Sequence, residues 1–349
     1  MKIAKEQQDL PLLPDRHPTG DFFIADIFDN LPFKDDIASM EHPIFSLSKN
    51  KDLRQLEYAR DHIRITVAPS IYGLPTIFDK DVLLYCGSLL MNEVNKGVIP
   101  PRTLRISTHD LLVATNRTIN GQSYALLKKA LDRLKGVSIK TNIKTNKREI
   151  TSSFGLIESY TIVESSRVKD RMIRLEITLS EWFYQSIIGK EVLTINRDYF
   201  RLGKPLERRL YEIARKHCGK SALWQISLKH LKEKTGSTSS MVKFRWFIRE
   251  ISKTDYLPDY TIHLGEDNIV TFKNRQMERV GDIPDLQEIP AISKQALRLG
   301  AKLVEEAGTG WDYLAIREQF TCQLLEGFRP DNVNGAFIGF VKKKVAQQP

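Results

Sequence analysis

Apolar residues recur at helical spacing in two separate stretches of the chain, and each stretch is followed by alternating patterns typical of β-strands. In the first stretch four apolar residues stand at i, i+3, i+7 and i+10: Tyr124, Leu127, Leu131 and Leu134. This spacing predicts a helix over about 122–135 that buries one face. A shorter helix is predicted over 108–114, because Ser107 is a good N-cap. A polar turn over 115–121 joins the two helices.

The second stretch repeats this order 117 residues later. Four apolar residues have the same spacing as in the first: Met241, Phe244, Ile248 and Ile251. They predict a long helix over 239–253, preceded by a short helix over 228–234 and a turn over 235–237. Alternating residues then predict a hairpin with strands over 261–264 and 269–272. The matching order and spacing indicate two copies of one fold type, although the side chains differ.

Strand patterns complete the first copy as well. After its long helix, strands are predicted over 137–140 and 156–163 on either side of a basic loop, which we interpret as a wing. We therefore expect an α+β fold with two tandem winged helix-turn-helix domains and a small helical C-terminal domain. The expected divisions are an irregular N-terminal arm over 1–40, a first winged-helix domain over 41–189, a second over 190–275, a linker over 276–290 and the helical domain over 291–349.

The positive charge of the chain is concentrated in the same two stretches. The formal net charge is +10, from 53 Lys and Arg against 43 Asp and Glu. Segment 102–150 holds 11 basic and 3 acidic residues, and segment 190–275 holds 18 basic and 10 acidic, so each has a net charge of +8. In the rest of the chain the positive and negative charges nearly cancel. Two basic helix–helix–strand–strand units indicate an elongated DNA site, because phosphates attract Lys and Arg.

Candidate DNA contacts follow from the docking of a helix-turn-helix, whose second helix enters the major groove with its early residues at the base edges. Asn120, Gln122 and Lys129 are candidates for base contact, because Asn and Gln can bond adenine bidentately and Lys favours guanine. The other DNA-facing candidates of the first unit are Arg117, Thr118, Ser123, Lys128, Arg133 and, in the predicted wing, Lys144, Lys147 and Arg148. The candidates of the second unit are Ser239, Ser240, Lys243, Arg245, Arg249 and Lys253.

Two features of the second unit allow more than one interpretation. Trp246 lies on the outward face of its helix and can pack on a base or sugar, or against another domain. The preceding helix, predicted over 205–217, carries four cations: Arg208, Arg209, Arg215 and Lys216. Because Glu207 and Glu212 intersperse them, part of this charge can be an ordinary solvated face.

The sequence contains no recognisable motif for catalysis, metal binding or membrane insertion. It has no G-x-x-x-x-G-K-[ST] run of a P-loop, no two histidines one residue apart, and no Cys-x-x-Cys pair for zinc. No apolar run approaches the roughly 18 residues of a membrane span, the N-terminus lacks an apolar signal core, and the three cysteines are far apart. We therefore expect a cytoplasmic DNA-binding protein with no enzymatic activity, no cofactor, no metal and no membrane partner.

Four short stretches carry a family resemblance: Ala38–Lys49, Thr76–Asp81, Pro205–Tyr211 and Ala214–Gly219. Over about 38–275 the chain resembles the plasmid replication initiator protein A family of proteobacteria. The resemblance implies binding to repeated double-stranded origin sites called iterons, opening of the origin, and recruitment of host proteins such as the host initiator and the replicative helicase. It also implies monomer–dimer self-association through one winged helix, and a location on the bacterial nucleoid or plasmid.

Other functions are compatible with part of this pattern. A winged-helix transcriptional repressor would use the same two modules, and an initiator can also repress its own gene. A nicking relaxase or a primase would need a catalytic motif, and the tyrosines and acidic residues of the chain form none that is recognisable.

Overall fold

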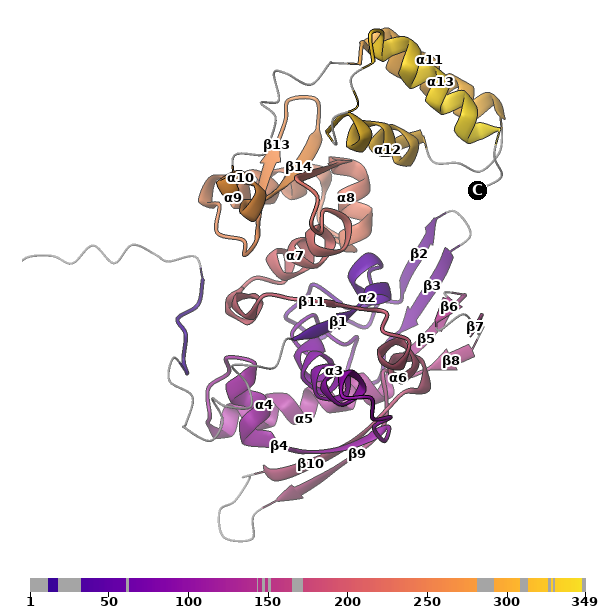
Figure 1. Cartoon of the computed structure of the whole chain (residues 1–349). Helices are drawn as coiled ribbons and strands as arrows, with labels where there is room; N and C mark the ends of the chain where they lie inside the picture. Colours follow the sequence, from indigo (N-terminus) through magenta and orange to yellow (C-terminus); the bar gives the residue numbers. More distant parts are fainter. Residues whose placement is uncertain are drawn as a thin grey trace, which may run out of the picture. The chain divides into compact units, whose positions relative to one another are not determined.

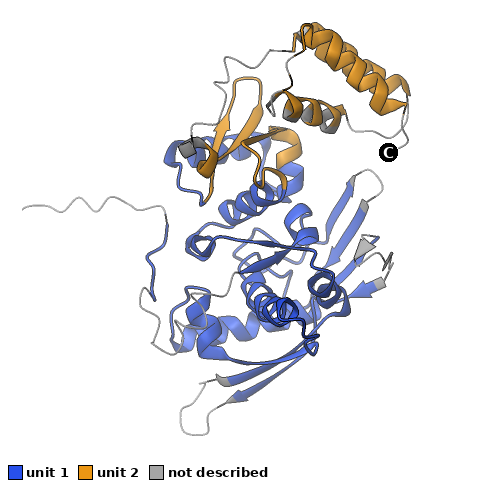
Figure 2. Ribbon diagram, viewed as in Figure 1, with its two compact units in different colours: residues 1–216, 232–258 blue, residues 217–231, 259–349 orange. Residues whose placement is uncertain are grey.

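A computed structural model describes most of the chain: residues 12–17, 33–60, 63–142, 144–145, 148–149, 152–164, 172–280, 292–307, 313–325, 328 and 330–346. Figure 1 gives the labels of the helices and strands. The chain folds into two compact units (Figure 2). Unit 1 contains residues 1–216 and 232–258, and unit 2 contains residues 217–231 and 259–349.

Unit 1 contains a three-stranded antiparallel sheet with the strand order β4-β10-β9. The elements of this region are α3 (Lys80–Asn95), β4 (Thr103–Ser107), α4 (Thr108–Ala114), α5 (Gly121–Gly136), β9 (Ile157–Glu164), β10 (Met172–Leu179) and α6 (Glu181–Ile188). Ser107 accepts a hydrogen bond from the N–H of Asp110 and so caps α4. Leu127, Leu131 and Leu134 are fully buried, because their helical spacing places them on one face of α5.

A second antiparallel sheet of unit 1 has the strand order β2-β3-β5-β8, and a hairpin, β6–β7, stands between β5 and β8 in the chain. These strands are β2 (Leu56–Arg60), β3 (Ile63–Ala68), β5 (Ser138–Thr141), β6 (Lys144–Thr145), β7 (Arg148–Glu149) and β8 (Ser152–Phe154). The prediction that strands over 137–140 and 156–163 frame one wing is wrong. β5 pairs with β3 and β8, whereas β9 pairs with β10. Alternating side chains mark a segment as a strand, but they do not identify the strand beside it.

Two aspartates near the N-terminus belong to folded structure. The elements here are β1 (Lys34–Asp36), α2 (Ile37–Glu41) and β11 (Val192–Thr194), and β1 pairs with β11. Asp36 caps α2 by accepting a hydrogen bond from the N–H of Ser39. Asp35 is buried, with its carboxylate 2.8 Å from the Lys80 ammonium. Residues 34–41 therefore differ from the irregular arm expected there, because these aspartates form a cap and an ion pair.

Residues 197–254 contain a helical region of the chain. Its elements are η1 (Arg197–Arg201, a 3-10 helix), α7 (Pro205–His217), α8 (Leu228–Thr235) and α9 (Met241–Thr254). The last residue of α7 and the first half of α8 belong to unit 2. Ser240 caps α9, and Asp255 ends it with a left-handed backbone at φ 46°. Phe244, Ile248 and Ile251 are buried, as the spacing predicts.

Unit 2 contains a three-stranded antiparallel sheet with the order β12-β14-β13, and three C-terminal helices. Its elements are β12 (Leu223–Ser227), β13 (Tyr260–Leu264), β14 (Ile269–Asn274), α10 (Arg275–Val280), α11 (Lys294–Ala307), α12 (Tyr313–Leu325) and α13 (Val333–Val345). Phe320 and Phe337 belong to the core of α11, α12 and α13, with ring centroids 5.4 Å apart. The predicted mixture of helix and sheet is confirmed.

Candidate nucleic-acid interface

The outer face of α5 carries three of the predicted DNA-contacting side chains in exposed positions. Gln122, Lys128 and Lys129 are exposed, and so are Ala125 and Leu126 beside them. These positions lie opposite the buried leucines of the helix, because helical spacing separates the two faces. The exposed face therefore presents an amide and two ammonium groups around a small apolar centre.

Asn120 and Ser123 have structural tasks at the start of α5. The side-chain oxygen of Asn120 accepts a hydrogen bond from the N–H of Ser123 at 2.9 Å, which caps the helix. Ser123 is buried, and its hydroxyl lies 2.8 Å from the hydroxyl of Thr118. The cap uses only the oxygen of the Asn120 amide, and a side-chain amide also carries two N–H donors. Capping and base contact by Asn120 are therefore compatible.

Arg117 and Arg133 bind carboxylates within unit 1. The guanidinium of Arg133 donates two hydrogen bonds of 2.7 Å to the carboxylate of Asp79, and these bonds raise the pKa of Arg133. Arg117 donates to Asp81 at 3.0 Å and to the backbone oxygen of Phe78. The side chain of Arg133 is 17% exposed and that of Arg117 is 19% exposed. Since Asp79 and Asp81 stand at the start of α3, both arginines hold α5 and its preceding turn against that helix.

Two of the three cations predicted for the wing of the first unit, Lys144 and Arg148, lie elsewhere in the fold. Lys144 is in β6 and Arg148 is in β7, and these two strands pair with each other. Lys147 lies outside the described residues. The hairpin that extends the sheet next to α5 is β9–β10 instead. A DNA contact by Lys144, Lys147 or Arg148 stays a prediction, without the wing geometry that motivated it.

The exposed face of α9 is cationic with an apolar strip. Lys243, Arg249 and Lys253 are exposed, whereas Arg245 is half-buried. Lys253 pairs with Glu250 at 3.0 Å. Two large apolar side chains share this face: Val242, which is 80% exposed, and Trp246, which is 55% exposed. Trp246 therefore keeps more than half of its surface open within the described part of the chain.

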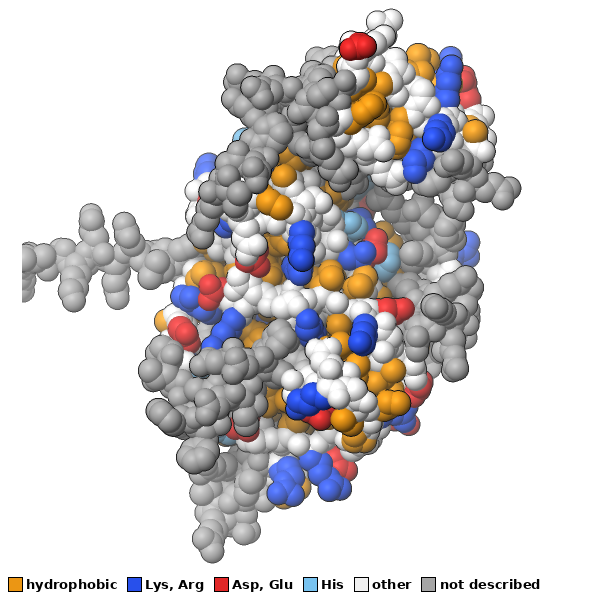
Figure 3. Space-filling view, in the orientation of Figure 1, with side chains coloured by type: hydrophobic (Ala, Val, Ile, Leu, Met, Phe, Trp, Pro, Cys, Tyr) orange, Lys and Arg blue, Asp and Glu red, His pale blue; other side chains and the backbone are white. Residues whose placement is uncertain are grey.

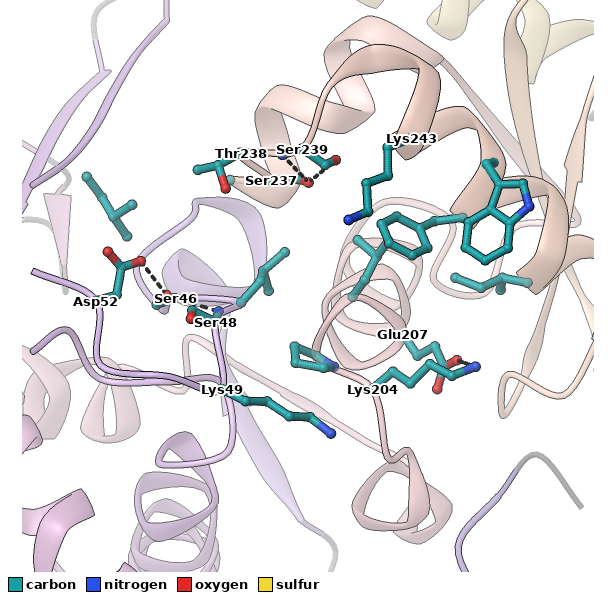
Figure 4. A pocket seen from close by; sticks show the side chains of 18 of the residues that line it. Ser46, Ser48, Lys49, Asp52, Lys204, Glu207, Ser237, Thr238, Ser239 and Lys243 are labelled. Atoms are coloured by element: carbon teal, nitrogen blue, oxygen red, sulfur yellow. Dashed lines mark hydrogen bonds and ion pairs between the residues drawn. The ribbon is translucent and has the colours of Figure 1, made fainter. Parts of the chain in front are cut away.

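Hydroxyl groups gather at the start of α9. Ser240 caps the helix by accepting a hydrogen bond from the N–H of Lys243 at 3.3 Å. The hydroxyls of Ser237 and Ser239 lie 2.9 Å apart in the turn before it. Figure 4 shows Ser237, Thr238 and Ser239 beside the first turn of α9, with Lys243 extending from that turn toward a cavity. The arrangement offers several donors next to a positive helix N-terminus.

Unit 1 has one cavity beside α5 and another beside α9, and Lys49 lines both. The cavity at α9, of about 590 Å³, is lined by Lys243, Trp246 and the segment 46–54, among others (Figure 4). The cavity at α5, of about 1010 Å³, is lined by Lys128, Lys129 and part of the same segment. Lys49 donates a hydrogen bond to the backbone oxygen of Gly203 at 3.1 Å. Reasoning from helix faces missed Lys49, although it ends the first stretch that carries the family resemblance.

The charge of α7 is buried around a cluster of opposite charges. Lys80 lies 2.8 Å from Asp35 and 3.0 Å from Glu212, and each of these side chains is at most 1% exposed. Arg209 lies 3.0 Å from the other oxygen of Glu212, and the hydroxyl of Tyr199 donates to Glu212 at 2.7 Å. Burial alone would lower the pKa of Lys80, but the two carboxylates raise it above its ordinary value. Lys80 therefore stays charged inside the protein.

Two arginines of α7 also bind backbone oxygens and a second carboxylate. Arg208 lies 2.6 Å from Asp81, and its guanidinium stands 4.5 Å from the ring centre of Phe78. Arg209 donates to three backbone oxygens, those of Ser39, Met40 and Lys234. Both arginines are 3% exposed. The stretch Pro205–Tyr211, which carries part of the family resemblance, thus contributes interior contacts.

Other kinds of site are not found in the described residues. Among them, no group of three or more His, Cys, Asp or Glu side chains is arranged to hold a metal ion. No helix in the described ranges has the length and apolar character needed to cross a bilayer. Figure 3 shows Lys and Arg interspersed with Asp and Glu on the face drawn, so this face is not a continuous basic patch. The candidate interface is therefore limited to the exposed faces of α5 and α9 and to the segment 46–54, which contributes Lys49 to both cavities.

Comparison with solved structures finds similar chains at low sequence identity. A structure of RctB domains 2 and 3 has 13% identity and a TM-score of 0.46, and the match covers 70% of this chain and 99% of that chain. A structure of the Pi initiator protein in complex with iteron DNA has 14% identity and a TM-score of 0.37, with 62% and 98% of the two chains covered.

Comparison of the sequence identifies its relatives more directly. A Wigglesworthia glossinidia brevipalpis protein named as a replication protein is 42% identical over 258 residues, which cover 73% of this chain and 94% of the relative. The family model for replication initiator protein A matches residues 34–262. The predicted resemblance is confirmed. The chain belongs to the replication initiator protein A family.

Proposed function

We propose that the protein initiates plasmid replication by binding repeated sites, or iterons, in the double-stranded DNA of an origin. Family membership supports replication initiation. The proposed DNA contacts are made by α5 and α9, as the second helices of two tandem winged helix-turn-helix modules. Along the chain the first module is β4-α4-α5 followed, after the intervening strands β5 to β8, by β9-β10, and the second is α7-β12-α8-α9-β13-β14. The hairpins β9–β10 and β13–β14 would be their wings.

The observation that carries the proposal is the sharing of Lys49 between the cavities at α5 and α9. α5 contributes Lys128 and Lys129 to its cavity, and α9 contributes Lys243 to the other. A phosphate backbone that passes from one helix to the other would meet Lys49 on the way. Cations along such a path release counterions on binding, which supplies affinity for any sequence. Base edges would then be read from the exposed faces of the two helices.

Several finer features belong to the same proposal. They are opening of the origin, recruitment of the host initiator and the replicative helicase, and monomer–dimer self-association. Residues 41–189 and 190–275 are proposed to carry the two modules, and residues 291–349 to form a separate helical domain after the linker 276–290, of which 276–280 lie in α10. The activity would consist of binding and distorting DNA, without a chemical step of its own.

Replication in cells tests the proposal. A plasmid that carries the cognate origin is introduced into cells with the intact gene, with a deleted gene, and with the Lys128→Ala/Lys129→Ala variant. We expect plasmid maintenance only with the intact gene. Equal maintenance with the deleted gene would contradict the initiator function. Footprinting of the purified protein on the same origin should show protection at regularly repeated positions, since iterons recur.

A parallel experiment tests the absence of catalysis. The purified protein is incubated with supercoiled origin plasmid and Mg²⁺, and the products are separated by electrophoresis. We expect the plasmid to stay supercoiled. A nicked product that disappears when the protein is heat-inactivated would assign a nicking activity and remove that part of the proposal.

A further inference from the structure

The first turn of α9 exposes an aliphatic side chain where neither helix stability nor packing requires one. Val242 is the second residue of the helix and is 80% exposed. Valine is a poorer helix former than alanine, because its branched side chain loses freedom against the preceding turn. A valine at this position therefore costs a small amount of helix stability. A side chain that neither packs in the core nor favours the helix is available for a task outside the folded chain.

The surroundings of Val242 favour a nucleic-acid partner over a protein partner. α9 contains four Lys or Arg and a single acidic residue, Glu250. Lys243 and Arg249 are exposed on either side of the strip of Val242 and Trp246. The centres of protein–protein interfaces are depleted in Lys and Ser, whereas this helix starts from a serine-rich turn and carries lysine next to the valine. The charge is complementary to a phosphate backbone.

The chemistry of the strip identifies what it can read. Early residues of the second helix meet base edges in the major groove. An apolar side chain among them contacts the C5-methyl group of thymine, which is the one apolar group displayed there. Trp246 stands one helical turn further along the same face, so it can cover the contact and exclude water.

We propose that Val242 is a specificity-determining residue that recognises a thymine methyl group in the DNA bound by α9. This inference rests on the proposed DNA-binding function and adds the chemical group that the second module reads. It also assigns different methods of reading to the two modules: the first offers the amide of Gln122, and the second offers an aliphatic surface.

Removal of one methyl group tests the inference. The full-length protein first selects duplexes from a random-sequence pool, and the selected duplex is the probe. Each thymine of the probe is then replaced by deoxyuracil, which lacks only the C5-methyl group, and dissociation constants are measured for the wild type and for Val242→Ala. With the wild type we expect binding to weaken roughly fourfold at one position, which is about the value of one buried methyl group. With Val242→Ala we expect no change at that position.

Val98→Ala is the matched control, because Val98 is also exposed but lies outside α5 and α9. We expect this variant to keep the wild-type response to deoxyuracil. The inference is overturned if the wild type binds every substituted probe equally, or if Val242→Ala keeps the wild-type loss. An effect of Val242→Ala on self-association alone would assign the strip to a protein contact and would also overturn it. Failure of the pool to yield any bound duplex would instead contradict the proposed function.

Discussion

Helices α7 and α9 each carry four cations, and two of the four in each helix lie in opposite environments. In α7, Arg208 and Arg209 are 3% exposed and bind carboxylates and backbone oxygens. In α9, Lys243 and Arg249 are exposed. The comparison teaches that a count of basic residues locates a charged helix but does not distinguish a surface that can bind DNA from an internal support.

The difference follows from the neighbours of each helix. α7 contains Glu207 and Glu212, and Asp35, Lys80 and Asp81 of the preceding region pack around it. Buried charges are tolerated when opposite charges and hydrogen bonds surround them. α9 has one acidic residue, and Val242, Lys243, Trp246 and Arg249 are exposed on its outer face. Four substitution experiments can break or sharpen this contrast.

The largest expected effect comes from Arg209→Met compared with Arg249→Met. The first substitution removes one of the donors to Glu212 and the guanidinium that binds three backbone oxygens, so it should destabilise the protein by about 3–5 kcal/mol. The second removes an exposed cation and should change stability by less than about 0.5 kcal/mol. Urea unfolding of both purified variants measures the difference. Similar losses for the two variants would remove the contrast between the helices.

Acidification should destabilise the same region of the protein, because His42 lies near Arg209. This side chain is 4% exposed and packs against Tyr58, with 5.3 Å between ring centres and the rings tilted by 52°. Burial, with help from nearby cations such as Lys234 and Arg209, lowers the pKa of His42 to about 4. The unfolded chain takes up a proton near pH 6.5, whereas the native state does not until about pH 4. Stability should therefore fall as the pH falls from about 6.5 to about 4.

The loss is at most roughly 3.5 kcal/mol, because the pKa of His42 falls from 6.5 to about 4 on folding and one pKa unit corresponds to about 1.4 kcal/mol. The free energy of unfolding, measured between these pH values, should fall more steeply with falling pH for the wild type than for His42→Asn. Parallel pH profiles for the two proteins would show that His42 does not supply the acid sensitivity.

A moderate effect is expected on DNA binding when the exposed cations are removed in pairs. Lys128→Ala/Lys129→Ala on α5 and Lys243→Ala/Arg249→Ala on α9 should each weaken binding roughly tenfold and lower the salt dependence by about two phosphate contacts. Binding titrations at several salt concentrations give both quantities. As a control, Lys96→Ala/Lys302→Ala removes two exposed cations elsewhere. This variant should leave the affinity and its salt dependence unchanged. A pair on α5 or α9 that also leaves the salt dependence unchanged would exclude that helix from the interface.

The smallest effect concerns the two helix caps. Asn120→Ala and Ser240→Ala should each destabilise the protein by about 1 kcal/mol, because both side chains accept a hydrogen bond from a backbone N–H. Asn120→Ser keeps a capping oxygen and removes the amide. If Asn120 also contacts a base, this variant should retain its stability in urea but lose affinity for the selected duplex. Unchanged affinity would limit Asn120 to capping.

Sequence periodicity predicts the two long helices and their buried faces because apolar spacing is a local property. Predicted bounds of 122–135 and 239–253 compare with Gly121–Gly136 and Met241–Thr254 in the structure. Pairing of strands is not local, so the partner of β5 was assigned wrongly. The position of Val242 on an outward face was also predictable. Its exposure of 80% became meaningful only with the packing around it known.

The candidate site was predictable in part for the same reason. Gln122, Lys128 and Lys129 follow directly from the helix face, and all three are exposed. Arg133 occupies that face as well, but Asp79 from another element binds it. No pattern within 122–135 reveals a carboxylate more than 40 residues away. Lys49 was missed because it lies outside both helices, and only the cavities connect it with them.

The cluster around Arg209 should limit how the two halves of this chain can be exchanged with those of a relative. One guanidinium ties the backbone at Ser39 and Met40 to that at Lys234, and Glu212 shares Lys80 with Asp35. A chimaera that joined the first half of one plasmid's initiator to the second half of another would have to inherit matching charges from both parents. A new DNA specificity should therefore arise more easily from substitutions on the exposed faces of α5 and α9 than from the replacement of a whole module.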